Sequence, residues 1–339
     1  MKVLITGATG FLGPRLCQRM VTEGYQVRIL YRQTSDLAAI AKLPFEKALG
    51  DITDAESVRA AVKGCRYVIH AAANASHQPG ARQEQMRVNV DGTRHVARAA
   101  RAQGVERFLH ISSVAAIGIP TDPARPADED FPFNVENTGL TYHISKHRGE
   151  REVLTEVDRG LDAVIVNPAL ICGPTARGYR VPQSMQRALT SWITPYSPGG
   201  QCLVHVEDVL GGIVLALRKG QSGNRYILGG SNVSFRDMSN AVRKGLHLSR
   251  LLIPVPSLLA EYKVKITNLF RRILRVSLTP GYDRRFCHQF YTSRKAQQEL
   301  GYEPRDFAAM AEEFLSDVNA GRFRRGVEKR GLQDLKRGR

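Results

Sequence analysis

The 339-residue sequence lacks the features of a secreted, membrane-spanning or metal-binding protein. It has no run of about 20 apolar residues that could cross a bilayer. A strand-like segment and a glycine-rich turn occupy the N-terminus, where a signal peptide would need a cleavable apolar region. We therefore predict no transmembrane span and a cytoplasmic location. The cysteines are odd in number and scattered, with no CxxC pair, so we expect free, mostly buried thiols and no metal: Cys17, Cys65, Cys172, Cys202 and Cys287.

Positive charge is in excess, and most of it lies towards the C-terminus. The net charge is +17, and residues 243–339, with 21 Lys and Arg against 10 Asp and Glu, contribute +11 of it. Within residues 259–275, apolar side chains recur at helical spacing beside five Lys and Arg, which predicts a basic amphipathic helix. Such a helix packs on a protein core or lies on an anionic membrane. Peripheral membrane contact through this region therefore stays open, whereas nucleic acid is not expected as a partner.

The first half of the chain alternates between short apolar segments and amphipathic ones. The candidate strands, rich in apolar or β-branched residues, are 2–6, 26–32, 45–50, 66–72, 108–112 and 163–167. Between or after them lie candidate helices, each followed by a glycine suited to a C-cap: 11–23 with Gly24, 54–63 with Gly64, 83–103 with Gly104, and 142–159 with Gly160. This alternation predicts an α/β fold, a doubly wound parallel sheet with right-handed crossovers.

A glycine-rich turn, TGATGFLG at residues 6–13, joins the first strand to the first helix. Gly7 permits a tight turn, Gly10 lets the backbone approach a pyrophosphate, and Gly13 allows the helix to pack closely on the strand. The helix N-terminus offers free N–H groups to an anion. Because the turn stands between a predicted strand and a predicted helix, it indicates dinucleotide binding.

The alternation breaks after residue 168 into connections rich in proline and glycine. A helix at 206–219 and a strand at 225–228 follow, and then helix-rich sequence. We predict an NAD(P)-binding Rossmann domain over residues 1–167, completed by about 203–230. A smaller, interleaved, helix-rich substrate-binding domain takes 168–202 and 231–321. Residues 322–339 are mostly charged and are expected to form a flexible basic tail.

The GxxGxxG spacing of the turn resembles the fingerprint of extended short-chain dehydrogenases/reductases, within the NAD-dependent epimerase/dehydratase superfamily. The resemblance continues in GDITD at 50–54, HAAA at 70–73, VNVDGT at 88–93 and LVHVEDV at 203–209. It implies that Asp51 lies against the adenine, while Asn89 could either pin a helix or join a proton relay. Together, the turn and the resemblance predict these cofactor contacts: Gly7, Thr9, Gly10, Phe11, Leu12, Gly13, Arg32, Asp51, Ile52, Ala71, Ala72, Tyr142, Lys146 and Pro168.

The candidate catalytic residues are Tyr142, Lys146 and Ser113. Tyr142 and Lys146 are four residues apart and so lie on one face of a helix. A tyrosine near pKa 10 is a poor acid or base at neutral pH, and a nearby ammonium lowers that pKa towards the working range. Ser113 stands at a strand end on the carboxyl edge of the sheet, where ligands of such sheets bind. The resemblance implies that its hydroxyl orients the substrate oxygen, with Ser112 as the alternative.

The end of the second strand favours NADP over NAD. Enzymes that prefer NAD carry an acidic residue there to bind the ribose 2′-OH, whereas enzymes that prefer NADP carry a cation. Here Tyr31 occupies that position, Arg32 follows it, and Thr34 and Ser35 could hydrogen-bond a phosphate. NADP is therefore the predicted cofactor, and NAD is the alternative.

The segment VNPALICGP at 166–174 resembles the dihydroflavonol-reductase branch rather than the RxxNVYGP type of sugar-nucleotide epimerases. We therefore expect reduction of a ketone, or oxidation of the alcohol, in a fairly apolar small molecule, as in dihydroflavonol-reductase-like and 3β-hydroxysteroid-dehydrogenase-like members. The alternative is a nucleotide-sugar epimerase or dehydratase with tightly bound NAD. A non-catalytic dinucleotide sensor is disfavoured because the catalytic set is complete. Tyr179 and residues 184–198 should line the substrate pocket. Whether the chain forms a homodimer is left open by the sequence.

Overall fold

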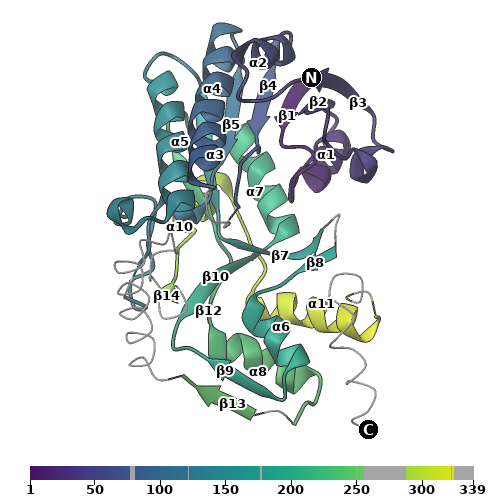
Figure 1. Ribbon diagram of the computed structural model, residues 1–339, viewed down its shortest axis with the longest axis vertical. Helices are drawn as coiled ribbons and strands as arrows, with labels where there is room; N and C mark the ends of the chain where they lie inside the picture. The colour runs from purple at the N-terminus through teal and green to yellow at the C-terminus, as the bar shows by residue number, and fades with distance from the viewer. Residues whose placement is uncertain are drawn as a thin grey trace, which may run out of the picture.

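The structure is a computed structural model, and it describes residues 1–76, 81–120, 122–175, 178–249, 251–255, 288–321 and 323. Its main sheet has seven parallel strands in the order β11-β6-β5-β4-β1-β2-β3. This sheet lies in the upper half of Figure 1. The strands are β1 (Lys2–Thr6), β2 (Gln26–Tyr31), β3 (Phe45–Leu49), β4 (Tyr67–His70), β5 (Arg107–Ile111), β6 (Ala163–Pro168) and β11 (Arg225–Leu228). The predicted doubly wound α/β fold is therefore confirmed.

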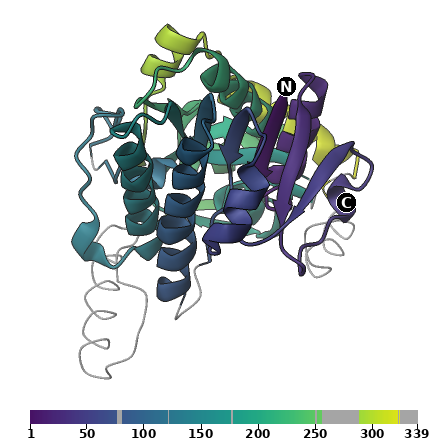
Figure 2. The ribbon, with the colours of Figure 1, turned by 90° about the horizontal axis from the view of Figure 1, so that it is seen from above.

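Helices cover both faces of this sheet (Figure 2). On one face lie α2 (Ala55–Val62), α4 (Thr93–Ala102) and α5 (Thr141–Val157), and on the other α1 (Gly13–Thr22) and α7 (Val206–Lys219). The predicted helix at 83–103 is divided into α3 (Arg82–Met86), a π-helical segment (Arg87–Gly92) and α4. Every residue of β6 is buried, as expected for a parallel strand covered on both faces. The four glycines predicted to follow helices all adopt positive φ.

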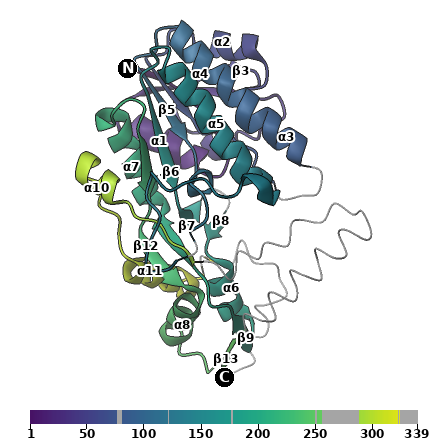
Figure 3. The same ribbon diagram turned by 90° about the vertical axis from the view of Figure 1, so that its left-hand side faces the viewer.

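A second layer begins immediately after β6, because the chain leaves the first sheet at Pro168 and enters β7 at Leu170. Its main sheet has the order β12-β10-β7-β8, with β14 paired to β10. The strands are β7 (Leu170–Thr175), β8 (Gly178–Arg180), β10 (Gly200–His205), β12 (Ser231–Ser234) and β14 (His288–Gln289), and a separate pair is formed by β9 (Ile193–Tyr196) and β13 (Leu251–Pro254). Figure 3 shows this layer below the main sheet.

The second layer contains more β-structure than the helix-rich sequence predicts. The helices are α6 (Gln183–Thr190), α8 (Phe235–Gly245), α10 (Arg294–Leu300) and α11 (Phe307–Asn319). Its strands are short and interrupted by proline and glycine, so their local pattern is weak and their pairing depends on contacts between distant segments. Met185, Met238 and Phe314 form the centre of a small apolar core between its helices and its sheet.

Two predicted basic segments lie outside the described residues: the amphipathic helix at 259–275 and the tail at 322–339, apart from Phe323. None of the helices in the described ranges combines the length and the apolar character that a membrane crossing demands. Four of the five cysteines are described, and all four are buried free thiols; Cys287 lies outside these ranges.

Candidate active site

A cleft of about 890 Å³ opens at the carboxyl ends of the parallel strands, between the two layers. This is the edge where open α/β sheets bind their ligands. The structure brings all the residues predicted for cofactor binding and catalysis to the walls of this cleft: Gly7, Thr9, Gly10, Phe11, Leu12, Gly13, Arg32, Asp51, Ile52, Ala71, Ala72, Ser113, Tyr142, Lys146 and Pro168. Residues from seven separate segments of the sequence thus surround one space.

The glycine-rich turn is packed too closely for larger side chains at two of its positions. Gly7 has φ +74°, and a Cβ built on it would lie 2.6 Å from the Ala72 nitrogen. A Cβ on Gly13 would lie 2.2 Å from the Gly7 oxygen. A Cβ on Gly10 would have only that oxygen nearby, at 3.1 Å. The turn therefore leaves its backbone, and the N-terminus of α1, accessible to a pyrophosphate, and these residues fit a dinucleotide.

A chain of hydrogen bonds centred on His70 supports this turn from beneath. The Ala72 N–H donates to Thr6 Oγ1 (3.3 Å), which lies 2.7 Å from His70 Nδ1. On its other side, His70 Nε2 lies 3.0 Å from Thr93 Oγ1, and that hydroxyl donates to the Asn89 carbonyl. Burial lowers the pKa of His70 to about 3, so the ring is neutral at physiological pH. Its part in the site was not predicted, although a histidine inside a buried apolar strand was a signal that could have revealed it.

Arg32 and Asp51 lie on the part of the cleft next to the end of β2. The Arg32 backbone N–H donates to Ser35 Oγ at 3.0 Å, and Asp51 Oδ1 accepts two hydrogen bonds from Thr53. Ser35 lines the cleft, whereas Thr34 does not. Within the described part of the chain, no carboxylate forms an ion pair with the exposed Arg32 guanidinium. This guanidinium is therefore available to a phosphate ligand.

Lys146 is held almost completely buried on the floor of the cleft. Its side chain is 2% exposed, and its Nζ donates to the Ile111 carbonyl at 3.0 Å, at the end of β5. Burial lowers the pKa of Lys146 to about 8, while the charge of Glu150 acts in the opposite direction. Tyr142 lies on the same face of α5, one turn earlier, and also lines the cleft. An ammonium fixed in this position favours the phenolate form of a neighbouring tyrosine.

Ser113 follows β5 in an extended conformation, with φ −166°. Its Oγ accepts a hydrogen bond from the Ala115 N–H at 3.2 Å and so caps the short 3₁₀ helix Val114–Ala116. The hydroxyl keeps its own proton, which can be donated to a substrate oxygen. Ser112 also lines the cleft but is only 7% exposed. The geometry thus favours Ser113 over Ser112 for substrate contact.

Glu150 and Asn167 connect the helix of Tyr142 and Lys146 to the strand end of Ser113. Asn167 Nδ2 donates to the Ser113 carbonyl (2.9 Å) and to Glu150 Oε1 (2.6 Å). Both side chains are buried, and the other Glu150 oxygen pairs with Arg225 at 3.3 Å. Neither residue was predicted from the sequence. A glutamate four residues after Lys146 on a helix was the available signal.

We expect Glu150→Gln to change the pH dependence of activity. The amide can still accept from Asn167, but the negative charge that raises the Lys146 pKa is lost, so this pKa should fall below about 8. The alkaline limb of the pH–kcat profile should move to lower pH, and kcat at pH 8 should fall about twofold or more. Glu152→Gln is the matched control, because Glu152 lies on the same helix but pairs outwards with Arg94. Equal profiles for both variants would contradict this role for Glu150.

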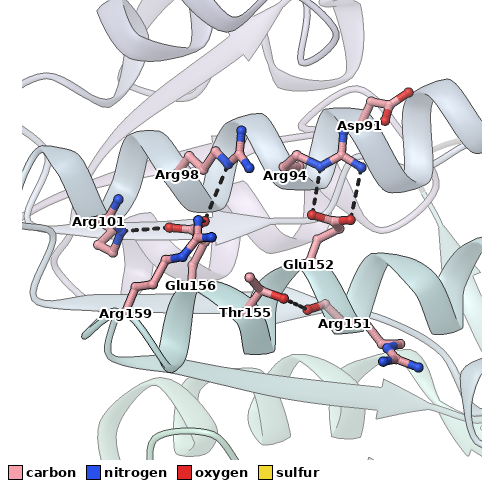
Figure 4. Close-up of polar contacts among 9 residues, drawn as sticks. All are labelled: Asp91, Arg94, Arg98, Arg101, Arg151, Glu152, Thr155, Glu156 and Arg159. Carbon is pink, nitrogen blue, oxygen red and sulfur yellow. Dashed lines mark hydrogen bonds and ion pairs between the residues drawn. The ribbon is translucent and has the colours of Figure 1, made fainter.

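Ion pairs of Glu152 and Glu156 with arginines join α5 to α4 (Figure 4). Arg94 binds both carboxylate oxygens of Glu152, at 2.8 and 3.0 Å. Glu156, which is 1% exposed, receives Arg101 (2.7 Å), Arg159 (2.9 Å) and Arg98 (3.4 Å). Although burial opposes it, hydrogen bonds from Arg101 and Arg159 hold the pKa of Glu156 below its usual value. These contacts fix the helix that carries the catalytic candidates.

The amide of Asn89 is fully occupied by structural contacts. Its Oδ1 accepts from the Asn74 N–H (2.7 Å), and its Nδ2 donates to the Asn74 carbonyl (3.0 Å) and to Ser145 Oγ (2.9 Å). These contacts favour a structural role over a proton relay, because through them Asn89 joins the π-helical segment to α5 and to the loop after β4.

The predicted substrate-pocket residues are placed differently by the structure. Tyr179 does not line the cleft; its ring packs 5.5 Å from that of Phe314, in the core of the second layer. No residue of 184–198 lines the cleft either. Neighbouring residues of a strand point to opposite faces, so in β8 it is the next residue, Arg180, that lines the cleft. The other contributions from the second layer are Leu170, Ile171, Gln201, Cys202, Gln289 and Tyr291.

Arg180 reaches across the cleft to the glycine-rich turn. Its guanidinium lies over the Phe11 ring, 4.7 Å from the ring centre. Gln201 and Gln289 face one another at 3.4 Å, and the rest of this wall is largely apolar. The cleft therefore has a polar, glycine-lined side suited to a dinucleotide and a second wall with few charges.

Comparison with known proteins places this site in a family. Residues 3–229, more than half of the chain, match the model of the NAD dependent epimerase/dehydratase family. The chain belongs to this family. Its relatives include sterol demethylase protein B of Methylococcus capsulatus, 38% identical over 233 residues, which are 68% of this chain and 70% of that protein. A putative dihydroflavonol 4-reductase of Synechocystis sp. is 33% identical over 310 residues, 88% of each chain.

Among solved structures, the crystal structure of gox2253 has a TM-score of 0.81 and 32% identity, and the match covers 95% of this chain and 99% of that one. The predictions of the extended short-chain dehydrogenase/reductase type, the Rossmann fold and an oxidoreductase are confirmed by these similarities. Family membership also implies a nicotinamide dinucleotide as the cofactor.

Proposed function

We propose that this protein is an NADP(H)-dependent oxidoreductase that reduces a ketone, or oxidises the alcohol, of a fairly apolar small molecule. The observation that carries the proposal is the arrangement of one cleft: Tyr142, Lys146 and Ser113 line the same space as the glycine-rich turn and Arg32. A proton donor and a dinucleotide cradle in one cavity are what carbonyl reduction requires.

Each catalytic candidate has a task that follows from its position. A bound nicotinamide dinucleotide would supply or accept the hydride. The Tyr142 hydroxyl would give the proton to the substrate oxygen, and the buried Lys146 ammonium would lower the pKa of that phenol. Ser113 would donate a hydrogen bond to the same oxygen while negative charge develops on it. Glu150 and Asn167 act through other residues: they are positioning residues for Lys146 and Ser113.

The character of the cleft wall supports an apolar substrate. Leu170, Ile171, Cys202 and Tyr291 come from the second layer, and Arg180 is the one charged residue that the described part of this layer adds. The names of the two relatives above refer to a sterol and to a dihydroflavonol. Ketones of comparable polarity, tested with NADPH by loss of its absorbance, are therefore the first substrates to try.

A nucleotide-sugar epimerase or dehydratase is the alternative, favoured by the family to which the chain belongs and by the Arg180 guanidinium, which could bind a diphosphate. The two functions differ in their use of the cofactor. A reductase consumes one added NADPH for each product, whereas an epimerase recycles a tightly bound NAD. Turnover of a nucleotide sugar without net change in NADPH absorbance would replace our proposal with this alternative.

We expect Arg32→Asp to move the cofactor preference from NADP(H) towards NAD(H). The substitution removes the exposed guanidinium beside Ser35 and introduces an acceptor that repels a 2′-phosphate but can bind a ribose hydroxyl. The ratio of kcat/KM for NADPH to that for NADH should fall by about a hundredfold. Arg59→Asp, at an exposed arginine on α2 that pairs with Glu56, is the control. A wild-type enzyme that already prefers NADH would show the NADP proposal to be wrong.

A further inference from the structure

The β9–β13 pair lies at the end of the second layer, away from the glycine-rich turn (Figure 1). Its exposed residues form an apolar surface. It consists of Trp192, which is 69% exposed, and of the outer face of the β9–β13 pair, with Ile193 (55%), Leu251 (59%) and Ile253 (40%). Pro195 is exposed beside them. We call these five residues the β9–β13 patch. A contiguous patch of exposed apolar side chains commonly marks a site where a protein binds another molecule or a membrane.

The patch follows from the register of the two strands. Ile193 is opposite Leu251, and Pro195 is opposite Ile253, so four apolar side chains share the outer face. The residue of β9 that is turned inwards and buried is a polar one, Thr194, which is 2% exposed. A solvated sheet normally has the reverse pattern, with polar residues outside. Contact with water alone therefore does not explain why apolar residues occupy the outer face. This face is suited to an apolar partner.

The edges of the pair argue against a further β-strand as that partner. The N–H groups of Leu251 and Val255 donate to the carbonyls of Trp192 and Tyr196, so these positions point between the two strands. The alternate positions, which point to the free edges, include Pro195 and Pro254, and proline has no N–H to donate there. A second copy or a peptide that adds by strand pairing would lack these hydrogen bonds. A lipid surface needs none.

Charge and residue type indicate which lipid surface fits. Tryptophan is enriched where proteins meet the interface of a bilayer, because its ring is apolar and its N–H is polar. Helix α8, which packs against β9, carries Arg243 and Lys244 in its last turn. In the sequence alone, residues 250–287 contain eight Lys and Arg against two acidic residues. Basic residues near an apolar patch strengthen binding to anionic lipids. We propose that the β9–β13 patch docks this protein onto an anionic membrane.

The chain offers a direct probe, because Trp192 is its single tryptophan. The full-length protein would be titrated with vesicles of 70% phosphatidylcholine and 30% phosphatidylglycerol at physiological salt. We expect co-sedimentation with these vesicles, a blue shift of the Trp192 emission, and quenching by lipids brominated on their acyl chains. The affinity of the protein for vesicles of pure phosphatidylcholine should be lower by about tenfold or more. No turnover is needed, so the result is independent of the proposed function.

The double variant Ile193→Ser/Leu251→Ser tests the patch itself and keeps the fluorescent reporter. Both side chains are mostly exposed, so the fold should be preserved, and the vesicle partition coefficient should fall about tenfold or more. Leu49→Ser is the matched control, because Leu49 is 61% exposed on β3 of the other sheet and should have no effect.

Three results would overturn the proposal. The first is the absence of vesicle binding by the wild-type protein. The second is binding that leaves the Trp192 emission unchanged, which would place the contact elsewhere. The third is a wild-type dimer that the double variant converts to a monomer without a change in vesicle affinity, which would assign the patch to a second copy of the chain.

Discussion

Tyr142→Phe is expected to lower kcat by several orders of magnitude while leaving the Kd for NADPH nearly unchanged. The phenylalanine ring fills almost the same space on α5, but it has no proton to give to the substrate oxygen. Lys146, which remains bonded to the Ile111 carbonyl, cannot replace the tyrosine, because its position on the cleft floor is fixed by that contact. Stopped-flow or steady-state loss of NADPH absorbance measures kcat, and calorimetric titration measures Kd.

Tyr179→Phe is the control for the loss of a tyrosine hydroxyl. Tyr179 belongs to the same half of the molecule as the apolar cleft wall but packs on Phe314 and does not line the cleft. Its replacement should leave kcat within about twofold of the wild type. Activity of Tyr142→Phe within about tenfold of the wild type would mean that another group donates the proton, and the assignment of Tyr142 would be wrong.

Gly10→Val is expected to abolish measurable binding of NADPH and NADH alike. The branched side chain would occupy the space that the pyrophosphate needs at the N-terminus of α1. Gly10 is the suitable position because its Cβ would meet only the Gly7 oxygen, at 3.1 Å, so the turn itself can survive. At Gly13 a Cβ would be 2.2 Å from that oxygen, and a substitution there would disrupt the turn as well as the site.

The measurement is calorimetric titration with both cofactors, accompanied by circular dichroism to show that the fold is intact. Gly211→Val is the control, because Gly211 lies in α7 outside the cleft and its Cβ would have no atom within 4 Å. This variant should bind NADPH as the wild type does. Full cofactor affinity in Gly10→Val would show that the phosphates bind somewhere other than the glycine-rich turn.

The first sheet could be predicted from the sequence because its elements are encoded locally. An apolar run such as Lys2–Thr6 has few conformations other than a buried strand, and a glycine such as Gly24 marks the end of a helix by its positive φ. The predicted strand at 225–228 and helix at 206–219 coincide with β11 and α7 for the same reason. These strands of the second layer have only two to six residues, and β7 includes Gly173 and Pro174, so only their pairing across the chain defines them.

The sequence by itself determined the doubly wound fold, the glycine-rich turn and the spacing of Tyr142 and Lys146, because each depends on neighbours within a few residues. Only the tertiary structure decided that Tyr179 turns into a core and Arg180 into the cleft, since the choice between the faces of β8 depends on its pairing with β7. The Glu150–Asn167–Ser113 contacts and the β9–β13 patch likewise join residues 17 to 58 positions apart. Such contacts require the closure of long loops, and the entropy lost in closing them is offset only when the whole chain packs. No local sequence pattern indicates which pairs will meet.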